Sequence, residues 1–265
     1  MDYQKNIIND LVLLRKKQPL VHNITNLVVM QQTANALLAI GASPIMAHAT
    51  TELEELLQIV SSLVLNIGTL DDEWIHSMCE AAELANRFNK PIVLDPVGAG
   101  ASKLRTFTAT YLCDLCKPTI IRGNAGEILS LAGCAIKSKG VDSQYQSSAA
   151  FEAAQALAHK YQSTIVVSGE IDYIVSANQQ QQIHNGVPLM TRVTGMGCTA
   201  TAISAAFCAV QPDAHQAATS AMAVMGVAGQ MAFSKAQQPG SFAVSFLDAL
   251  YSISADDIQQ FAIIK

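Results

Sequence analysis

The sequence predicts an α/β fold with a mainly parallel central sheet and helices on both of its faces. Short apolar runs alternate with stretches of helical period through the middle of the chain. The predicted strands are apolar throughout, which is typical of parallel strands buried on both sides. From residue 197 onward the pattern is almost entirely helical. No repeat, low-complexity tract or linker is visible, so we expect one domain over residues 1–265.

The predicted elements alternate in order along the chain. Parallel strands are expected at residues 62–66, 91–95, 119–122 and 164–168. Helices are expected at residues 71–88, 103–113, 126–131 and 147–161. Residues 172–176 and 181–184 have the pattern of a hairpin with a polar turn at 178–180.

Composition limits the classes of partner. Of the 265 residues, 50% are hydrophobic and 14% are charged, which predicts a large core and a rather apolar surface suited to an oligomer. The net charge is −5 and no block of Lys or Arg occurs, so we expect no nucleic-acid partner. The apolar region 197–233 is interrupted by Pro212, Asp213 and His215 and falls short of the ~20 apolar residues of a membrane span. Two buried helices fit it better, so no membrane contact is expected.

The six cysteines lack the spacing of a disulfide framework. Residues 1–18 are amphipathic and charged and do not resemble a signal peptide. We therefore expect a cytoplasmic protein. Cys113 and Cys116 form the one close pair, and two cysteines on one helical face explain it better than a zinc site, which needs further soft ligands.

One segment points directly to an anion site. Gly195, Met196 and Gly197 lead into an Ala-rich run that is expected to be a buried helix. Backbone N–H groups at a helix N-terminus have no intrahelical partners and attract negative charge, and glycine lets a phosphate approach closely. Cys198 lies at the mouth of this cradle. The alternative is a glycine-containing helix start with a buried cysteine.

Polar clusters follow four of the predicted strands. They begin at Asn66, Asp95, Arg122 and Ser168. Any one of them could be an ordinary turn. In open α/β sheets, however, ligands bind at the carboxyl ends of the strands, so four such ends together with the cradle favour one shared site.

The side chains at these ends suit phosphate and metal binding. Arg122 can fork onto phosphate oxygens, unless it makes a surface ion pair. Asn124 and Glu127 stand at i and i+3 in a first helical turn, and Asp95 and Glu127 can share Mg²⁺ through waters. The alternative for Glu127 is a charge favoured by the helix dipole. Neither the P-loop pattern nor G-x-G-x-x-G is present, which disfavours a dinucleotide oxidoreductase.

A family resemblance rests on these motifs. Asn124-x-x-Glu127 together with Gly195-x-Gly197 before a helix resembles the ribokinase-like superfamily. The chain resembles the hydroxyethylthiazole kinase family more specifically, in the segments Pro19-Leu-Val-His-Asn-Ile-Thr-Asn26, Gly41-Ala-Ser-Pro-Ile-Met46, Asn66-Ile-Gly-Thr-Leu70, Leu94-Asp-Pro-Val-Gly-Ala-Gly-Ala101, Ile121-Arg-Gly-Asn124 and Thr194-Gly-Met-Gly-Cys198. The match extends from about residue 19 to residue 200.

The resemblance implies ATP-dependent phosphorylation of the primary alcohol of 4-methyl-5-(2-hydroxyethyl)thiazole, a thiamine salvage step. It also implies a homotrimer with active sites at subunit interfaces. Its site residues carry over as ATP contacts at Arg122 and Ser168, thiazole contacts at Met46 and Gly195, and Mg²⁺ ligands at Asp95 and Glu127. Beside these, we expect the amide of Asn124 to bind ATP and that of Asn26 to bind the alcohol substrate. Ser168 departs from the Thr that is usual in the family but keeps the hydroxyl.

The acceptor end of the site leaves alternatives open. Asn23, Thr25 and Asn26 offer uncharged hydrogen bonds to a heteroaromatic ring, and Met46 offers a polarizable sulfur unless it fills the core. Relatives in the superfamily have an aspartate base where this chain has Cys198. A helix N-terminus lowers a thiol pKa and ATP phosphates oppose this, so Cys198 is either a base or a group that positions the hydroxyl. A pyrimidine-alcohol kinase and a non-catalytic sensor are the rival functions.

Overall fold

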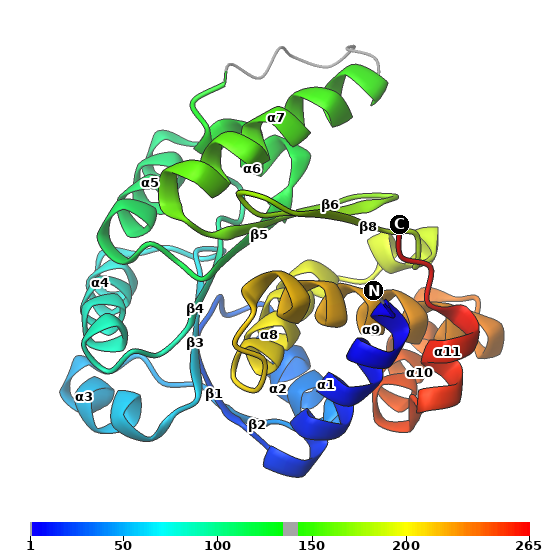
Figure 1. The fold of residues 1–265 in the computed structure, drawn as a ribbon. Coiled ribbons are helices and arrows are strands. Elements are labelled where there is room, and N and C mark those ends of the chain that lie inside the picture. The colour runs from blue at the N-terminus through cyan, green and yellow to red at the C-terminus, as the bar shows by residue number, and fades with distance from the viewer. Residues whose placement is uncertain (1, 135–142) are drawn as a thin grey trace.

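An eight-stranded sheet forms the centre of the protein (Figure 1). The computed structural model describes residues 2–134 and 143–265, with the backbone alone at 143–148. The strand order is β2-β1-β3-β4-β5-β6-β7-β8. The first six strands in this order are parallel, and β7 and β8 are antiparallel. The bounds are β1 Leu20–Ile24, β2 Ser43–Ile45, β3 Ser62–Asn66, β4 Ile92–Asp95, β5 Ile120–Asn124, β6 Thr164–Ser168, β7 Asp172–Val175 and β8 Gln180–Ile183.

Helices cover both faces of the sheet, as predicted (Figure 1). One face carries α3 Thr50–Ile59, α4 Asp72–Arg87, α5 Lys103–Cys116, α6 Ala125–Leu131 and α7 Ser143–Tyr161. The other carries α1 Tyr3–Lys17, α2 Met30–Ile40, α8 Met196–Cys208, α9 Ala214–Lys235, α10 Pro239–Ser252 and α11 Ala255–Phe261. A short 3₁₀ helix, η1 Pro188–Arg192, precedes α8.

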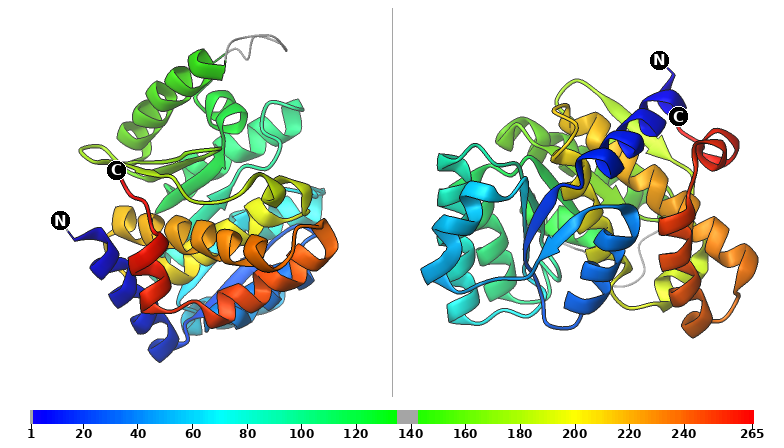
Figure 2. Two further views of the ribbon diagram at one scale, coloured as in Figure 1. Left: turned by 90° about the vertical axis from the view of Figure 1, so that its right-hand side faces the viewer. Right: turned by 90° about the horizontal axis from the view of Figure 1, so that it is seen from below.

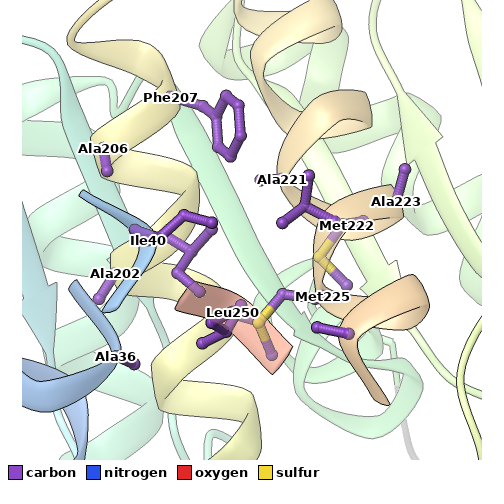
Figure 3. Close-up of a cluster of buried hydrophobic side chains, with 14 of the residues drawn as sticks. Ala36, Ile40, Ala202, Ala206, Phe207, Ala221, Met222, Ala223, Met225 and Leu250 are labelled. Atoms are coloured by element: carbon purple, nitrogen blue, oxygen red, sulfur yellow. The ribbon is translucent and has the colours of Figure 1, made fainter. Parts of the chain in front are cut away.

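Small side chains let α8 pack closely between the sheet and α9. Figure 3 shows Ala202 and Ala206 of α8 beside Ile40 of α2, with Met222 of α9 and Leu250 of α10 closing the cluster. The predicted pair of buried helices in this region is therefore confirmed. No helix among the described residues is both long and apolar enough to cross a membrane.

The predicted strands and helices after residue 61 are confirmed, with shifts of a few residues at their ends. The hairpin is also confirmed, since Tyr173 pairs with Gln182 in antiparallel register. Cys113 and Cys116 both lie buried on α5, and no metal-binding group of three or more His, Cys, Asp or Glu occurs in the described part of the chain. Residues 19–61, for which no elements are predicted from the sequence, form β1, α2, β2 and α3.

The two ends of the chain lie side by side (Figure 2). The Gln4 side chain of α1 donates a hydrogen bond to the Ala262 carbonyl at 3.0 Å. Beyond α11 the last residues pair with β8, where Gln182 and Lys265 exchange backbone hydrogen bonds of 2.8 and 3.0 Å. This pairing covers the exposed edge of β8 and protects the backbone groups there.

Candidate functional site

The predicted strand ends meet at one edge of the sheet. Asn66 at the end of β3 pairs in register with Asp95 at the end of β4. Asn124 at the end of β5 pairs in register with Ser168 at the end of β6. The N-terminus of α8 lies at this same edge, because Thr201, in the second turn of the helix, donates to Asp95 Oδ2 at 2.7 Å. The shared edge that the sequence predicts is therefore present.

The start of α8 has the geometry of an anion cradle. Gly195 is its N-cap, with φ of 84°, and no side chain caps the helix. The first helical bond runs from the Thr199 N–H to the Gly195 carbonyl at 2.8 Å, so the N–H groups of Met196, Gly197 and Cys198 lack intrahelical partners. A Cβ at Gly195 would be 2.9 Å from Val29 Cγ1. The backbone conformation and the close contact both require glycine here.

Arg122 lies against the cradle. A Cβ at Gly197 would stand 2.6 Å from Arg122 Nη1, so only glycine lets the guanidinium approach the helix start. Arg122 Nη2 donates to Ser168 Oγ at 2.6 Å, and the buried Nε has no partner. No carboxylate is within ion-pairing distance of Arg122 in the described residues. The surface ion pair is therefore not formed, and the guanidinium retains donors for an anion.

Asp95 is a buried carboxylate with one free oxygen. Its Oδ2 accepts hydrogen bonds from Asn66 Nδ2 at 3.0 Å and Thr201 Oγ1 at 2.7 Å. Its Oδ1 is buried without a partner. Burial raises the pKa of Asp95 to about 6, against the opposing effect of the Arg122 guanidinium. A buried acceptor without a donor is costly, and a cation would compensate it.

Glu127 forms a capping box at the start of α6, which agrees with a charge favoured at a helix N-terminus. Its Oε2 accepts from the Asn124 N–H at 2.8 Å, and Asn124 Oδ1 accepts from the Glu127 N–H at 3.0 Å, which forms a capping box. Its Oε1 accepts from the Gly98 N–H at 2.9 Å. Both oxygens are thus held by backbone N–H groups. Glu127 also contributes to the raised pKa of Asp95, although burial is the larger cause, so the two carboxylates are close enough to interact.

A chain of side-chain amides connects Cys198 to Asp95. Asn26 Nδ2 donates to Asn66 Oδ1 at 2.8 Å and to Cys198 Sγ at 3.4 Å. Asn66 in turn donates to Asp95. Burial raises the pKa of the Cys198 thiol to about 11, and the Asp95 charge adds to this. The helix N-terminus therefore does not make a thiolate here, and Cys198 is a neutral thiol at neutral pH.

The acceptor end of the site is only partly assembled from the predicted residues. Asn26 is buried beside Cys198, whereas Asn23 donates to the Val21 carbonyl of its own strand at 2.9 Å. Met46 is half-buried directly after β2. The imidazole of His22 is buried and its Nε2 bonds to the Ala47 carbonyl at 2.8 Å, so it supports the loop that carries Met46.

The sequence predicts no role for three further side chains at the site. Thr201 holds Asp95 from α8, and its position three residues after Cys198 places it on the same helix face. Asp172 is buried at the start of β7, accepts from the Gly169 N–H at 3.0 Å, and has its pKa raised to about 6 by burial. Arg105 of α5 binds three carbonyls of the strand-end loops. No local motif marks Arg105.

The buried charge of Asp95 has a consequence for stability. In the folded protein its pKa is about 6, above the ordinary 3.8, so the carboxyl favours folding when protonated and loses that contribution as the pH rises through 6. Asn in its place has no charge to bury. We expect the stability of Asp95→Asn relative to the wild type to increase from about pH 4 to about pH 7, by at most about 3 kcal/mol. Urea unfolding across this range measures it, and a difference that stays constant with pH would contradict the assignment.

Comparison with known proteins identifies the family of this chain. The model of the hydroxyethylthiazole kinase family matches residues 11–256. A protein named hydroxyethylthiazole kinase from Leptospira biflexa is 57% identical, over 97% of this chain and 96% of its own length. The solved hydroxyethylthiazole kinase of Pyrococcus horikoshii is 42% identical, covers 98% of both chains and superposes with a TM-score of 0.92.

A ribokinase-like superfamily protein of Enterococcus faecalis shares the fold alone, with a TM-score of 0.66 at 13% identity over 96% of this chain and 90% of its own. The ribokinase-like architecture predicted from the sequence is therefore confirmed. The family model matches most of the chain and the relatives align over nearly their full length, so the chain belongs to the hydroxyethylthiazole kinase family.

Proposed function

We propose that this protein transfers the terminal phosphoryl group of ATP to the primary hydroxyl of 4-methyl-5-(2-hydroxyethyl)thiazole, as the names of its relatives indicate for those proteins. The observation that carries the proposal is the packing of Arg122 against Gly197 at the start of α8, next to Cys198. A guanidinium and three backbone N–H groups there converge where negative charge has to be stabilised during transfer.

In this proposal Arg122 and Ser168 bind the ATP phosphates. The guanidinium is already oriented by Ser168 Oγ and separated from any carboxylate partner within the described residues, so it retains its charge for the nucleotide. Asn124 is exposed beside Ser168 and supplies an amide to the same ligand. The N–H groups of residues 196–198, opened by the turn at Gly195, cradle the group in transfer.

The alcohol is placed on the other side of the cradle. Asn26 and Gly195 flank Cys198, and Met46 gives an apolar surface for the heteroaromatic ring. Since Cys198 is a neutral thiol, it positions the hydroxyl and does not remove its proton in advance. Phosphoryl transfer passes through a loose transition state that depends mostly on positioning and charge stabilisation, so this role is sufficient.

The residues at the strand ends fit a Mg²⁺ ion held with ATP. The orphaned, buried Asp95 Oδ1 is a direct ligand position, while Glu127, with both oxygens occupied by N–H groups, contributes through water. Mg²⁺ usually binds through one or two carboxylates and substrate phosphates, and this donor set agrees with that preference. When bound, the ion neutralises charge on the phosphates.

We also propose that the protein works as a homotrimer in the cytoplasm, with sites at the subunit interfaces. Leu27 and Val28 follow Asn26 and are 64% and 67% exposed. Two exposed apolar side chains beside a buried site residue suit a surface that a neighbouring subunit covers.

The central experiment is a phosphorylation assay with purified protein, ATP and Mg²⁺. Transfer to the hydroxyethylthiazole, detected as the thiazole phosphate by mass spectrometry, supports the proposal. A pyrimidine alcohol in the same assay tests the related kinase, and ATP binding without transfer to either alcohol would indicate a sensor instead.

Arg122→Ala should weaken the use of ATP more than the use of the alcohol, because it removes a charge-assisted contact. We expect KM for ATP to rise about 10- to 100-fold, equivalent to about 1.5–3 kcal/mol. Arg87→Ala is the control, since the exposed Arg87 side chain lies at the end of α4 and pairs with Glu54. Steady-state kinetics with each substrate varied measure the effect, and an unchanged KM for ATP would refute the assignment.

Asp95→Asn and Glu127→Gln should each raise the Mg²⁺ concentration needed for half-maximal rate, with the larger effect at Asp95 because its free oxygen is the direct ligand position. Asp257→Asn is a matched control, since Asp257 also forms a capping box, at α11. Metal titrations of the initial rate give the comparison. Wild-type metal dependence in both site variants would make these carboxylates purely structural.

Cys198→Asp should remain active, because a carboxylate at this position can accept the hydroxyl proton. The rate of Cys198→Ala should fall, because the thiol is lost, but the backbone cradle survives. The decrease should not exceed the contribution of a general base, which is about 10²–10⁴-fold. Single-turnover phosphorylation at saturating substrates tests both, with Cys208→Ala at the far end of α8 as control. An inactive but folded aspartate variant would mean that the thiol itself is required.

Val28→Asp should dissociate the trimer and lower activity, because it places a charge on the surface that the neighbour is proposed to cover. Val12→Asp on α1, where Val12 is 60% exposed, is the matched control. Sedimentation velocity together with activity at the same concentration distinguishes the two. A wild-type protein that is monomeric and fully active would overturn the assembly.

A further inference from the structure

One guanidinium joins the two halves of the site. We infer that Arg105 of α5 is a positioning residue. It fixes the loop after β3, which supports Cys198, relative to the loop after β4, which supports Glu127. This inference rests on the proposed phosphoryl transfer for its functional consequence, and on contacts within the protein for its structural basis.

Arg105 binds two loops at once. Its Nη1 donates to the Ile67 carbonyl at 3.0 Å and the Val97 carbonyl at 2.7 Å, and its Nη2 donates to the Gly68 carbonyl at 2.7 Å. Ile67 and Gly68 follow β3, and Val97 follows β4. The two loops leave adjacent strands, and α5 supplies the donors from outside the sheet. The last backbone bond between the two strand ends runs from the Ile67 N–H to the Asp95 carbonyl at 3.3 Å, and beyond it the Arg105 contacts link the two loops.

The first loop leads to Cys198. The Gly68 N–H donates to Asn66 Oδ1 at 3.0 Å, and that oxygen also accepts from Asn26 Nδ2, which in turn reaches Cys198 Sγ. The fit is tight, because a Cβ at Gly68 would stand 2.6 Å from Asn26 Nδ2. A shift of the 67–68 peptides would therefore move the amide pair that contacts the thiol.

The second loop leads to Glu127. Arg105 holds the Val97 carbonyl, and the N–H of the next residue, Gly98, donates to Glu127 Oε1 at 2.9 Å. Gly98 has φ of +73°, and a Cβ there would be 3.1 Å from Arg105 Cδ. The turn thus packs closely against the Arg105 side chain. A single peptide group, between Val97 and Gly98, accepts from Arg105 through its carbonyl and donates to Glu127 through its N–H.

Only a guanidinium suits this task. Three donor bonds in fixed directions reach two loops, whereas an ammonium is a point charge that satisfies them with less geometric control. Arg105 has no carboxylate within ion-pairing distance in the part of the chain that the structure describes, so the carbonyl dipoles are its main partners. Arg105→Lys therefore keeps the positive charge and removes the planar arrangement of donors.

The chain contains a matched control. Arg15 on α1 is also half-buried and also donates to three carbonyls, those of Leu250, Tyr251 and Ile253 at the end of α10. It packs against Gly41, another glycine with positive φ. It precedes the amino end of β1, opposite the site. Arg15→Lys thus removes a comparable three-carbonyl arrangement that has no connection to the site.

The experiment compares Arg105→Lys with Arg15→Lys in four measurements on the full chain. These are thermal unfolding, kcat and KM, the Mg²⁺ dependence, and the rate at which iodoacetamide alkylates Cys198, resolved by peptide mass spectrometry. We expect both variants to unfold at lower temperature. Arg105→Lys alone should lower kcat, by about 10²-fold for a misplacement near 1 Å, with a smaller change in KM for ATP.

The alkylation readout does not depend on turnover. Burial is the main cause of the raised thiol pKa, so loosening of the loops should expose Cys198 and make its alkylation faster in Arg105→Lys than in Arg15→Lys. As a second variant, Arg105→Ala should regain activity when guanidinium is added at a non-denaturing concentration, and methylammonium should not restore it.

Equal kcat, metal dependence and alkylation in the two lysine variants would overturn the inference and leave Arg105 with a stabilising role alone. If the wild type does not phosphorylate the thiazole alcohol, the proposed function fails, while the alkylation comparison still decides whether Arg105 positions Cys198.

Discussion

The burial of α8 on every side is the constraint on which the site depends. This helix packs on the sheet and on α9, so it cannot shift to seek partners for its first N–H groups. Gly195 and Gly197 leave those groups open, and the second glycine admits Arg122 beside them. The rigid core thus fixes a helix end whose first N–H groups have no intrahelical hydrogen-bond partners. Such preoriented donors can stabilise negative charge, as on a transferring phosphoryl group, without any rearrangement of the protein.

The same arrangement explains why so many polar groups are buried at this edge. Asp95 is 1% exposed and has no cationic side chain within ion-pairing distance among the described residues. Two neutral donors, from Asn66 and Thr201, hold one of its oxygens and leave the other without a partner. Such a group costs stability in the free protein, and a bound cation with ATP would offset that cost. The same free oxygen that lowers the stability of the protein would thus favour the binding of a cation.

The sequence could predict the shared edge because chain-local signals mark it. Apolar runs end in polar clusters at Asn66, Asp95, Arg122 and Ser168, and parallel strands bring such ends together. Residues 19–61 carry a weaker signal, because β2 has only three residues and includes a proline. Arg105 and Asp172 were not predicted, because their roles come from contacts with loops distant in sequence and no spacing rule encodes those contacts.

The ionisation of Cys198 shows how tertiary burial overrides a local rule. A cysteine at a helix N-terminus usually has a lowered pKa, but here burial and the Asp95 charge raise it to about 11. A carboxylate at this position would add a third negative group beside Asp95 and Glu127, whereas a thiol leaves the local charge unchanged. In the proposed transfer, the hydroxyl proton would have no strong acceptor on the protein and would leave late, to the transferred phosphoryl group or to water, which a loose transition state permits. Accurate placement would then replace basicity, in agreement with a site where the Asn26 amide, and not a base, contacts Cys198.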